Sequence, residues 1–245
     1  MATQSRFRYK RTMMSSPTPV RTLDHVTDWV FDLDNTLYPR ECNLFAQIDV
    51  RITQYVMDVT RLDFDTARTL QKQYYRDFGT TLNGLMHQHK IDPDHFLNTV
   101  HAIDYSPVDA HPGLIEAIRN LPGRKFILTN GDTTHARSVL ARLGGPELFE
   151  DVHDIRAMTY VPKPHRQAYD GFFARYGIDP TRAIMFDDLE KNLVVPHEVG
   201  MATVQVVAGA GFTHEQVDAW ELERAKGPHV HHVTADLAGF LRDLP

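Results

Sequence analysis

Four short apolar runs, separated by segments with helical periodicity, constrain the fold of this chain more than any other feature. The runs are DWVFDL (28–33), RKFILTN (124–130), RAIMFDD (182–188) and ATVQVV (202–207). Nearly continuous apolar runs of this length are typical of strands buried on both faces of a parallel sheet. Between them, residues 135–145 and 165–178 have helical periodicity and reach glycines where helices commonly end. Strands that alternate with helices indicate βαβ units, so we expect an α/β fold with a doubly wound parallel sheet.

Residues 39–110 interrupt this alternation, because they contain no convincing buried strand. Their apolar residues recur at helical spacing instead, over a length that far exceeds an ordinary βα connection. We therefore expect a small all-α domain inserted after the first strand. The core resumes at residue 111, where Pro112 suits the first turn of a helix. The predicted division is an N-terminal tail (1–26), a core (27–38 and 111–245) and a helical insertion (39–110).

The composition excludes several classes of partner. A chain of 245 residues with a net charge of -6 gives no reason to expect nucleic acid or an anionic membrane as a partner. No run approaches the roughly 18 apolar residues of a membrane span. Cys42 is the only cysteine, so no internal disulfide forms, and the basic first segment has no apolar stretch of the kind that secretory signals contain. A cytoplasmic location is the resulting prediction, and the oligomeric state is left open.

Two acidic pairs stand at the ends of two predicted strands. Asp32 and Asp34 share one side of the first strand, because successive side chains alternate, and that side faces the usual ligand crevice of an open α/β sheet. Close carboxylates share either a proton or a cation, and Mg²⁺ prefers such oxygen ligands. Solvated turn residues would explain one pair equally well. Asp187 and Asp188 repeat the pattern, and burying both pairs without a cation would be costly.

Three further polar features accompany the acidic pairs. Thr129 and Asn130 end the second strand before a helix, where a hydroxyl, an amide and free N–H groups of the helix N-terminus suit a phosphate, and Gly131 follows them. Lys163 lies between two prolines just before another helix, although a lysine there is more often simply exposed. Asn192 comes one helical turn after the second acidic pair.

In this order, the motifs resemble those of the haloacid dehalogenase (HAD) superfamily of phosphohydrolases. The four motifs are D-x-D-x-T with Thr36 as its last residue, Thr129-Asn130, Lys163 and the pair Asp187-Asp188. The helical insertion resembles the type-1 cap of that superfamily, and the likeness extends from about residue 27 to 210. It implies a HAD-like Rossmannoid core with an inserted all-α cap. Haloacid dehalogenases lack an acid at the position of Asp34, so its presence favours phosphate chemistry over carbon–halogen cleavage.

The resemblance also implies a role for each matched residue. Asp32 would be the nucleophile that forms an aspartyl-phosphate, and Asp34 the general acid and base, partly protonated beside a second carboxylate. Mg²⁺ would be held by Asp32, the main-chain carbonyl of Asp34, Asp187 and Asp188. Phosphoryl oxygens would be bound by Thr36, Thr129, Asn130 and Gly131. Lys163 would neutralise both the nucleophile and the transferring group.

A closer resemblance is to the pyrimidine 5′-nucleotidase branch, which removes phosphate from nucleoside monophosphates such as UMP and CMP. It is carried by YYRDFGTTLNGL (74–85) with HKID after it, TNGDTTHA (129–136), KPH and FDDLEKN. That branch usually has a small residue after the paired aspartates, where this chain has Leu189 and Glu190. Candidates to face the substrate from the cap are Tyr75, Thr80, Thr81 and Gly84, and helix packing is an equal alternative for them.

Two other functions fit the same sequence. A phosphatase of the same fold would hydrolyse another small phosphate ester, such as a sugar phosphate or phosphoglycolate. A receiver-like signalling domain also uses acidic pairs, a threonine and a lysine around Mg²⁺. In such a domain the doubled acids precede the phosphorylated aspartate and no helical insertion follows the first strand, whereas here the order is reversed.

Overall fold

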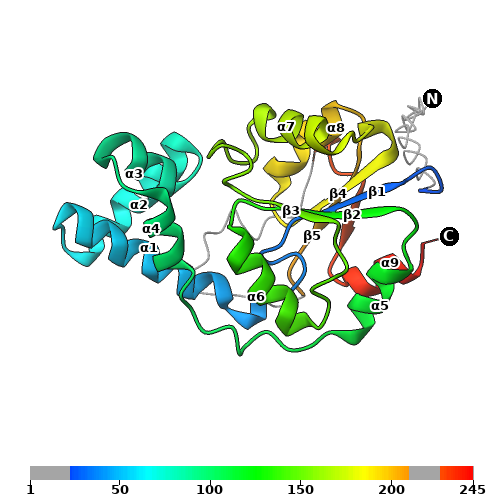
Figure 1. Cartoon of the computed structure of the whole chain (residues 1–245), viewed down its shortest axis with the longest axis horizontal. Helices are drawn as coiled ribbons and strands as arrows, with labels where there is room; N and C mark the ends of the chain where they lie inside the picture. Colours follow the sequence, from blue (N-terminus) through cyan, green and yellow to red (C-terminus); the bar gives the residue numbers. More distant parts are fainter. Residues whose placement is uncertain (1–22, 210–226, 245) are drawn as a thin grey trace, which may run out of the picture.

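The computed structural model of the chain describes residues 23–209 and 227–244 around a six-stranded parallel sheet (Figure 1). The strands are β1 (Asp28–Phe31), β2 (Arg124–Leu128), β3 (Asp151–His153), β4 (Ala183–Asp187), β5 (Ala202–Val206) and β6 (His232–Thr234). Their order in the sheet is β3-β2-β1-β4-β5-β6, with every neighbouring pair parallel. The order reverses between β1 and β4, which is where open α/β sheets bind ligands. The predicted doubly wound parallel sheet is confirmed.

Helices cover both faces of this sheet. They are α5 (Pro112–Asn120), α6 (Thr133–Leu143), α7 (Arg166–Tyr176), α8 (Val194–Glu198) and α9 (Leu237–Arg242), with short 3-10 turns η1 (Arg40–Cys42), η2 (Pro180–Arg182) and η3 (Glu190–Leu193). In Figure 1, α7 and α8 lie above the sheet and α5, α6 and α9 lie below it. Because side chains alternate along a strand, Trp29 and Phe31 of β1 pack in the core on the side of α5, α6 and α9, and Val30 packs with α7 and α8.

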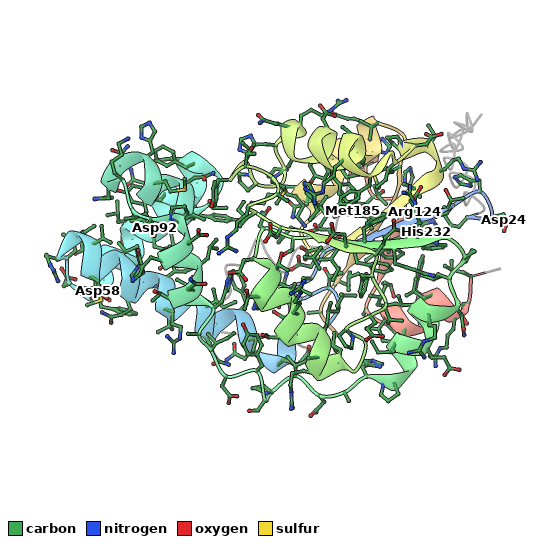
Figure 2. All side chains as sticks on the ribbon, in the orientation of Figure 1. Asp24, Asp58, Asp92, Arg124, Met185 and His232 are labelled. Carbon is green, nitrogen blue, oxygen red and sulfur yellow. The ribbon has the colours of Figure 1, made fainter. Side chains whose placement is uncertain are left out.

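The stretch between β1 and α5 is helical, as the spacing of its apolar residues predicts. Its helices are α1 (Leu44–Thr60), α2 (Phe64–Phe78), α3 (Thr81–His89) and α4 (Pro93–Val100). The side chains of Asp63, Thr80 and Asp92 each accept a backbone N–H at the start of a helix, which satisfies a donor that has no partner within the helix. These helices stand to one side of the sheet in Figure 1, and Asp58 and Asp92 mark them in Figure 2 at the opposite end of the molecule from Asp24.

The sequence analysis missed β3 and extended all four apolar runs one or two residues past the ends of their strands. β3 is only three residues long and polar in part, so it produces no apolar run. β1 ends at Phe31 rather than at residue 33. Residues 1–22 of the predicted tail lie outside the described residues. None of the helices in residues 23–209 and 227–244 combines the length and hydrophobicity that crossing a bilayer requires.

Candidate active site

Three buried aspartates meet where β1 and β4 end. Asp32 follows β1 and its backbone N–H donates to the carbonyl of Phe186, at 2.8 Å, which ties it to β4. Asp187 is the last residue of β4 and Asp188 comes next. Because Phe31 and Phe186 are paired in register, the carboxylates that follow them converge. One oxygen from each of the three aspartates lies within 4.8 Å of the others, and all three residues are buried.

Lys163 reaches this cluster from the loop before α7. Its Nζ donates to Oδ1 of Asp32 and to Oδ2 of Asp187, both at 2.7 Å, and its side chain is 1% exposed. The side chain of Asn130 holds the backbone of this lysine at both ends: Oδ1 accepts from the Lys163 N–H at 2.8 Å, and Nδ2 donates to the Lys163 carbonyl at 3.1 Å. Asn130 therefore positions Lys163. It also lines the cavity beside the aspartates, and its predicted binding of phosphate stays a prediction.

The cluster holds more negative charge than its two cationic neighbours balance. Burial raises the pKa of Asp32 to about 7, with Lys163 opposing the rise and Asp187 adding to it. Burial also raises the pKa of Asp188 well above its usual value, against the effect of Arg40, whose guanidinium lies 2.6 Å from its Oδ2. A divalent cation would relieve this excess, and a set of carboxylate oxygens is what Mg²⁺ prefers. The cluster therefore fits the predicted metal. The Asp34 side chain is not part of it, and its predicted contribution was a main-chain carbonyl.

Asp34 has different neighbours from Asp32. Its Oδ1 accepts from the Tyr38 hydroxyl at 2.6 Å and lies 2.7 Å from Nε2 of His135. Burial alone would raise the pKa of Asp34, but the charge and hydrogen bond of His135 lower the pKa to about 2. Burial likewise disfavours a charged His135, but the charge of Asp34 raises the pKa of this imidazole. The predicted partial protonation of Asp34 assumed a second carboxylate beside it, whereas in the structure an imidazole faces its Oδ1.

The remaining predicted phosphate-binding residues lie around these carboxylates. The Thr129 hydroxyl accepts from the Gly131 N–H at 3.0 Å, and both residues line the same cavity as Asp32 and Asp34. A Cβ added to Gly131 would lie 3.7 Å from Oδ2 of Asp34, so the glycine leaves room beside this oxygen. Thr36 is buried, and its hydroxyl donates to Oδ2 of Asp32 at 3.3 Å. Thr36 therefore contacts the predicted nucleophile and does not line the cavity.

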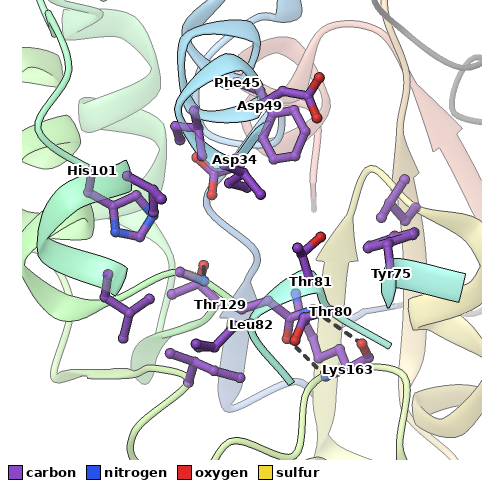
Figure 3. Close-up of a pocket in the computed structure, with 18 of the residues that line it drawn as sticks. Asp34, Phe45, Asp49, Tyr75, Thr80, Thr81, Leu82, His101, Thr129 and Lys163 are labelled. Atoms are coloured by element: carbon purple, nitrogen blue, oxygen red, sulfur yellow. Dashed lines mark hydrogen bonds between the residues drawn. The ribbon is translucent and has the colours of Figure 1, made fainter. Parts of the chain in front are cut away.

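The cavity of about 190 Å³ extends from the carboxylates to the inserted helices (Figure 3). One water needs roughly 10–15 Å³, so there is room for a small molecule. Three of the predicted cap residues, Tyr75, Thr80 and Thr81, line it. The Tyr75 hydroxyl accepts from Nζ of Lys191, at 2.6 Å, which joins α2 to the core. Gly84 is not among the lining residues. A Cβ there would overlap the Tyr74 side chain, so this contact supports helix packing as its role.

A buried polar group from the inserted helices also borders the cavity. The carboxylate of Asp49 accepts from Arg68 at 2.7 Å, from Gln71 at 2.6 Å and from Lys72 at 3.1 Å. Asp49, Gln71 and Lys72 line the cavity beside apolar side chains. The apolar and aromatic residues of this part of the lining are Phe45, Ile48, Ile52, Phe96, Leu97 and Val100. The cavity therefore has a polar edge on a largely apolar wall.

Several site residues were missed from the sequence. Tyr38 and Arg40 follow the first acidic pair closely, and their proximity to it was the available signal. His135 lies within the TNGDTTHA segment, but its partner Asp34 is distant in the sequence. Asp49 belongs to a helix whose buried face could not be oriented before its neighbours were known.

A parallel sheet with buried carboxylates at two strand ends, a buried lysine between them and helices inserted after the first strand is the arrangement typical of HAD-type hydrolases. The chain belongs to the haloacid dehalogenase-like hydrolase family, whose model matches residues 30–193. The fold and family predictions are confirmed to this level. Because the chain belongs to this hydrolase family, the alternative of a receiver-like signalling domain is set aside.

Individual relatives are more distant. "Phosphate metabolism protein 8" of Saccharomyces cerevisiae is 24% identical over 222 residues, which is 83% of this chain and 67% of that protein. Phosphoglycolate phosphatase of Haemophilus influenzae is 24% identical over 105 residues, 42% of this chain and 46% of that protein. The crystal structure of a HAD phosphatase from Thermococcus onnurineus superposes with a TM-score of 0.57 at 16% identity, covering 89% of this chain and 97% of that one.

These comparisons support the predicted class of enzyme but not a particular substrate. The hydrolase family, with a phosphatase among the sequence relatives, confirms the prediction of an enzyme of the phosphatase kind. The structural likeness, at 16% identity, shows the fold alone. The phosphoglycolate phosphatase alignment spans less than half of that protein's length, so its substrate is not carried over.

Proposed function

We propose that the protein is a Mg²⁺-dependent phosphatase that removes phosphate from nucleoside 5′-monophosphates, with pyrimidine nucleotides such as UMP and CMP as preferred substrates. The observation that supports the chemistry is the buried contact of Lys163 with both Asp32 and Asp187, at 2.7 Å each. Such a lysine keeps the nucleophile near a phosphoryl group that would otherwise repel it.

In the first half of the reaction, a carboxylate oxygen of Asp32 bonds to phosphorus while the bond from phosphorus to the ester oxygen breaks. The electron pair of the broken bond stays on the ester oxygen, which takes a proton from Asp34. In the substrate-free site His135 holds the pKa of Asp34 at about 2, against the effect of burial. A negatively charged phosphoryl group raises the pKa of a neighbouring carboxyl, which favours the protonated form that the acid role requires.

In the second half, water attacks phosphorus and gives a proton to Asp34. The bond between phosphorus and the Asp32 oxygen breaks, and its electron pair returns to the Asp32 carboxylate. The products are phosphate and the alcohol, and Asp34 holds a proton from water in place of the one that it gave to the alcohol. Lys163 remains paired with Asp32 and limits repulsion in both halves.

Asp32, Asp187 and Asp188 would hold Mg²⁺, since their oxygens already converge. When bound there, Mg²⁺ would neutralise phosphoryl oxygens that face the carboxylates. Thr129 and Gly131 line the same cavity and are our candidates to bind those oxygens. Because the Gly131 N–H already donates to the Thr129 hydroxyl, that hydroxyl is left to donate its own proton to a phosphoryl oxygen.

The cavity wall supports a nucleotide over a small anion. Phe45, Phe96 and Tyr75 line the cavity with aromatic side chains that suit a flat, partly apolar ring. The hydrogen-bonded group of Asp49, Gln71 and Lys72 gives the same lining a polar edge. The pyrimidine preference rests on the resemblance of segments 74–85 and 129–136 to the pyrimidine 5′-nucleotidase branch. We propose residues 39–110 as the cap that excludes water and contacts the nucleoside. The cytoplasmic location stays a prediction.

Phosphoglycolate is the second candidate substrate, because a phosphoglycolate phosphatase is among the relatives. A panel of UMP, CMP, AMP, a sugar phosphate and phosphoglycolate tests the choice through phosphate release, with Mg²⁺, without it, and with the Asp32→Asn variant. We expect the highest kcat/KM for UMP or CMP and no turnover without Mg²⁺ or Asp32. A tenfold higher kcat/KM for phosphoglycolate would replace the nucleotide assignment. Activity that survives both metal removal and Asp32→Asn would contradict the mechanism itself.

A further inference from the structure

The two oxygens of the Asp34 carboxylate lie in different surroundings. Oδ1 is contacted by both the Tyr38 hydroxyl and Nε2 of His135, at 2.6 and 2.7 Å. Oδ2 receives no hydrogen bond from the described residues and lies on the side of Gly131, where the cavity begins. The side chain is 19% exposed, so the group is open toward that cavity on one side only. Two partners on one oxygen fix the rotation of the carboxylate and leave the other oxygen available to a reacting group.

His135 is itself held from several directions. Its side chain is fully buried, its backbone N–H donates to Oδ1 of Asp132 at 2.7 Å, and its Nδ1 lies 3.0 Å from the Tyr105 hydroxyl. The His101 ring stacks on its ring with centroids 4.5 Å apart. Tyr105 and His101 belong to the segment that leads from α4 back to the sheet, and Tyr105 also donates to the His101 carbonyl at 3.0 Å. The imidazole therefore has one orientation, set by α6 on one side and by the return from the inserted helices on the other.

We propose that His135 and Tyr38 are positioning residues for the hydrolysis: they hold Oδ1 of Asp34 so that Oδ2 faces the ester oxygen and, later, the attacking water. This inference rests on the proposed acid and base role of Asp34. Effective proton transfer requires a heavy-atom separation of about 2.6–3.2 Å, and small errors in position reduce rates strongly. A carboxylate free to rotate would spend much of its time outside that range.

The proposal predicts that variants of His135 and Tyr38 lose activity to an extent that depends on the leaving group of the substrate. Departure of the UMP alkoxide needs a proton, whereas p-nitrophenolate leaves without one. For His135→Leu we expect kcat with UMP to fall about 10- to 100-fold with little change in KM, because acid–base catalysis contributes roughly 10²–10⁴-fold and the carboxylate is misplaced but present. The first-turnover burst of p-nitrophenolate from p-nitrophenyl phosphate should change less than about threefold.

Three further variants make the test decisive. His135→Gln retains a side-chain N–H donor and should recover most of the kcat with UMP. Tyr38→Phe removes a single hydroxyl and should lower the kcat with UMP about three- to tenfold. His153→Leu makes the same change at another buried histidine, whose two ring nitrogens have no partner, and should leave both substrates unaffected. If His135→Leu does not fold, as judged by its thermal unfolding, Tyr38→Phe carries the test.

Asp34→Asn separates failure of this proposal from failure of the proposed function. It should lose UMP activity more than any positioning variant while keeping the p-nitrophenolate burst. If Asp34→Asn behaves so but His135→Leu and Tyr38→Phe lose nothing, or lose both substrates equally, the positioning role is wrong. If Asp34→Asn itself keeps full UMP activity, the acid role of Asp34 is wrong. Should the wild-type protein hydrolyse phosphoglycolate instead of UMP, the same comparison is made with that alkyl phosphate.

Discussion

Lowering the pH should destabilise the protein through His153, the last residue of β3. Its side chain is buried, with Phe172 and Tyr176 packed edge-on at centroid distances of 5.4 and 5.7 Å. Neither ring nitrogen has a hydrogen-bond partner. Burial, with a smaller effect from Arg175, lowers the pKa of this imidazole from 6.5 to about 4. The folded protein therefore favours the neutral ring.

The size of the effect follows from the two pKa values. A group with a lower pKa in the folded state contributes stability that is complete above its unfolded pKa and is lost as the pH falls toward the folded one. The shift from 6.5 to about 4 corresponds to about 3 kcal/mol in full, at about 1.4 kcal/mol per pKa unit. Between about pH 7 and about pH 4.5, about 2 kcal/mol of this would be lost.

Urea unfolding at both pH values measures this loss, with His153→Phe as the variant that has no proton to gain. Other groups titrate over the same range, so the informative quantity is the difference in free energy of unfolding between variant and wild type. We expect that difference to move by about 2 kcal/mol in favour of His153→Phe on acidification. The same change at His87, which is exposed, is the matched control for replacing a histidine with phenylalanine. A difference that stays constant within about 0.5 kcal/mol would refute the buried neutral imidazole, since the shift is expected to be several times larger.

Three other changes test separate parts of the structure. Gly84→Ala should lower the free energy of unfolding by about 1–3 kcal/mol in a urea titration, because its Cβ would overlap Tyr74; an unchanged midpoint would contradict that packing. Mg²⁺ should raise the Tm of the wild-type protein by binding its folded state, and Asp187→Asn should abolish the rise, as a thermal melt with and without EDTA would show. Lys163→Met should reduce kcat with UMP by about 10³-fold or more, because no other cation contacts both Asp32 and Asp187 in the described part of the chain; a loss below tenfold would remove Lys163 from the mechanism.

The sequence predicted those site residues whose positions follow from the local pattern and from the geometry of a parallel sheet. Asp32 and Asp187 each follow an apolar run, and parallel strands bring their carboxyl ends to one edge, so their meeting follows from topology. Lys163 required the family resemblance, because a lysine between prolines is otherwise a surface residue. Its two contacts at 2.7 Å agree with that expectation.

The contacts that the sequence did not predict depend on how elements far apart in the chain are oriented relative to one another. His135 meets Asp34 across 101 residues, and Arg40 meets Asp188 across 148, so no local spacing connects either pair. The partner of His135 is fixed by the rotation of α6 about its axis, which depends on how α6 packs against the sheet and against Tyr105 and His101. Asn130 lies where expected, but its amide is used by the Lys163 backbone.

The most direct test of the account is to trap the phosphorylated nucleophile. Acid quench of the enzyme during turnover of UMP with Mg²⁺, followed by borohydride reduction, converts an aspartyl-phosphate into homoserine, which peptide mass spectrometry locates in the chain. We expect homoserine at position 32 in the wild-type protein and none in Asp32→Asn. With p-nitrophenyl phosphate as the substrate, Asp34→Asn should give an increased amount, because p-nitrophenolate leaves without a proton while attack by water still lacks its base. Full turnover with an unmodified Asp32, or a label at another aspartate, would contradict the assignment of Asp32 as the nucleophile.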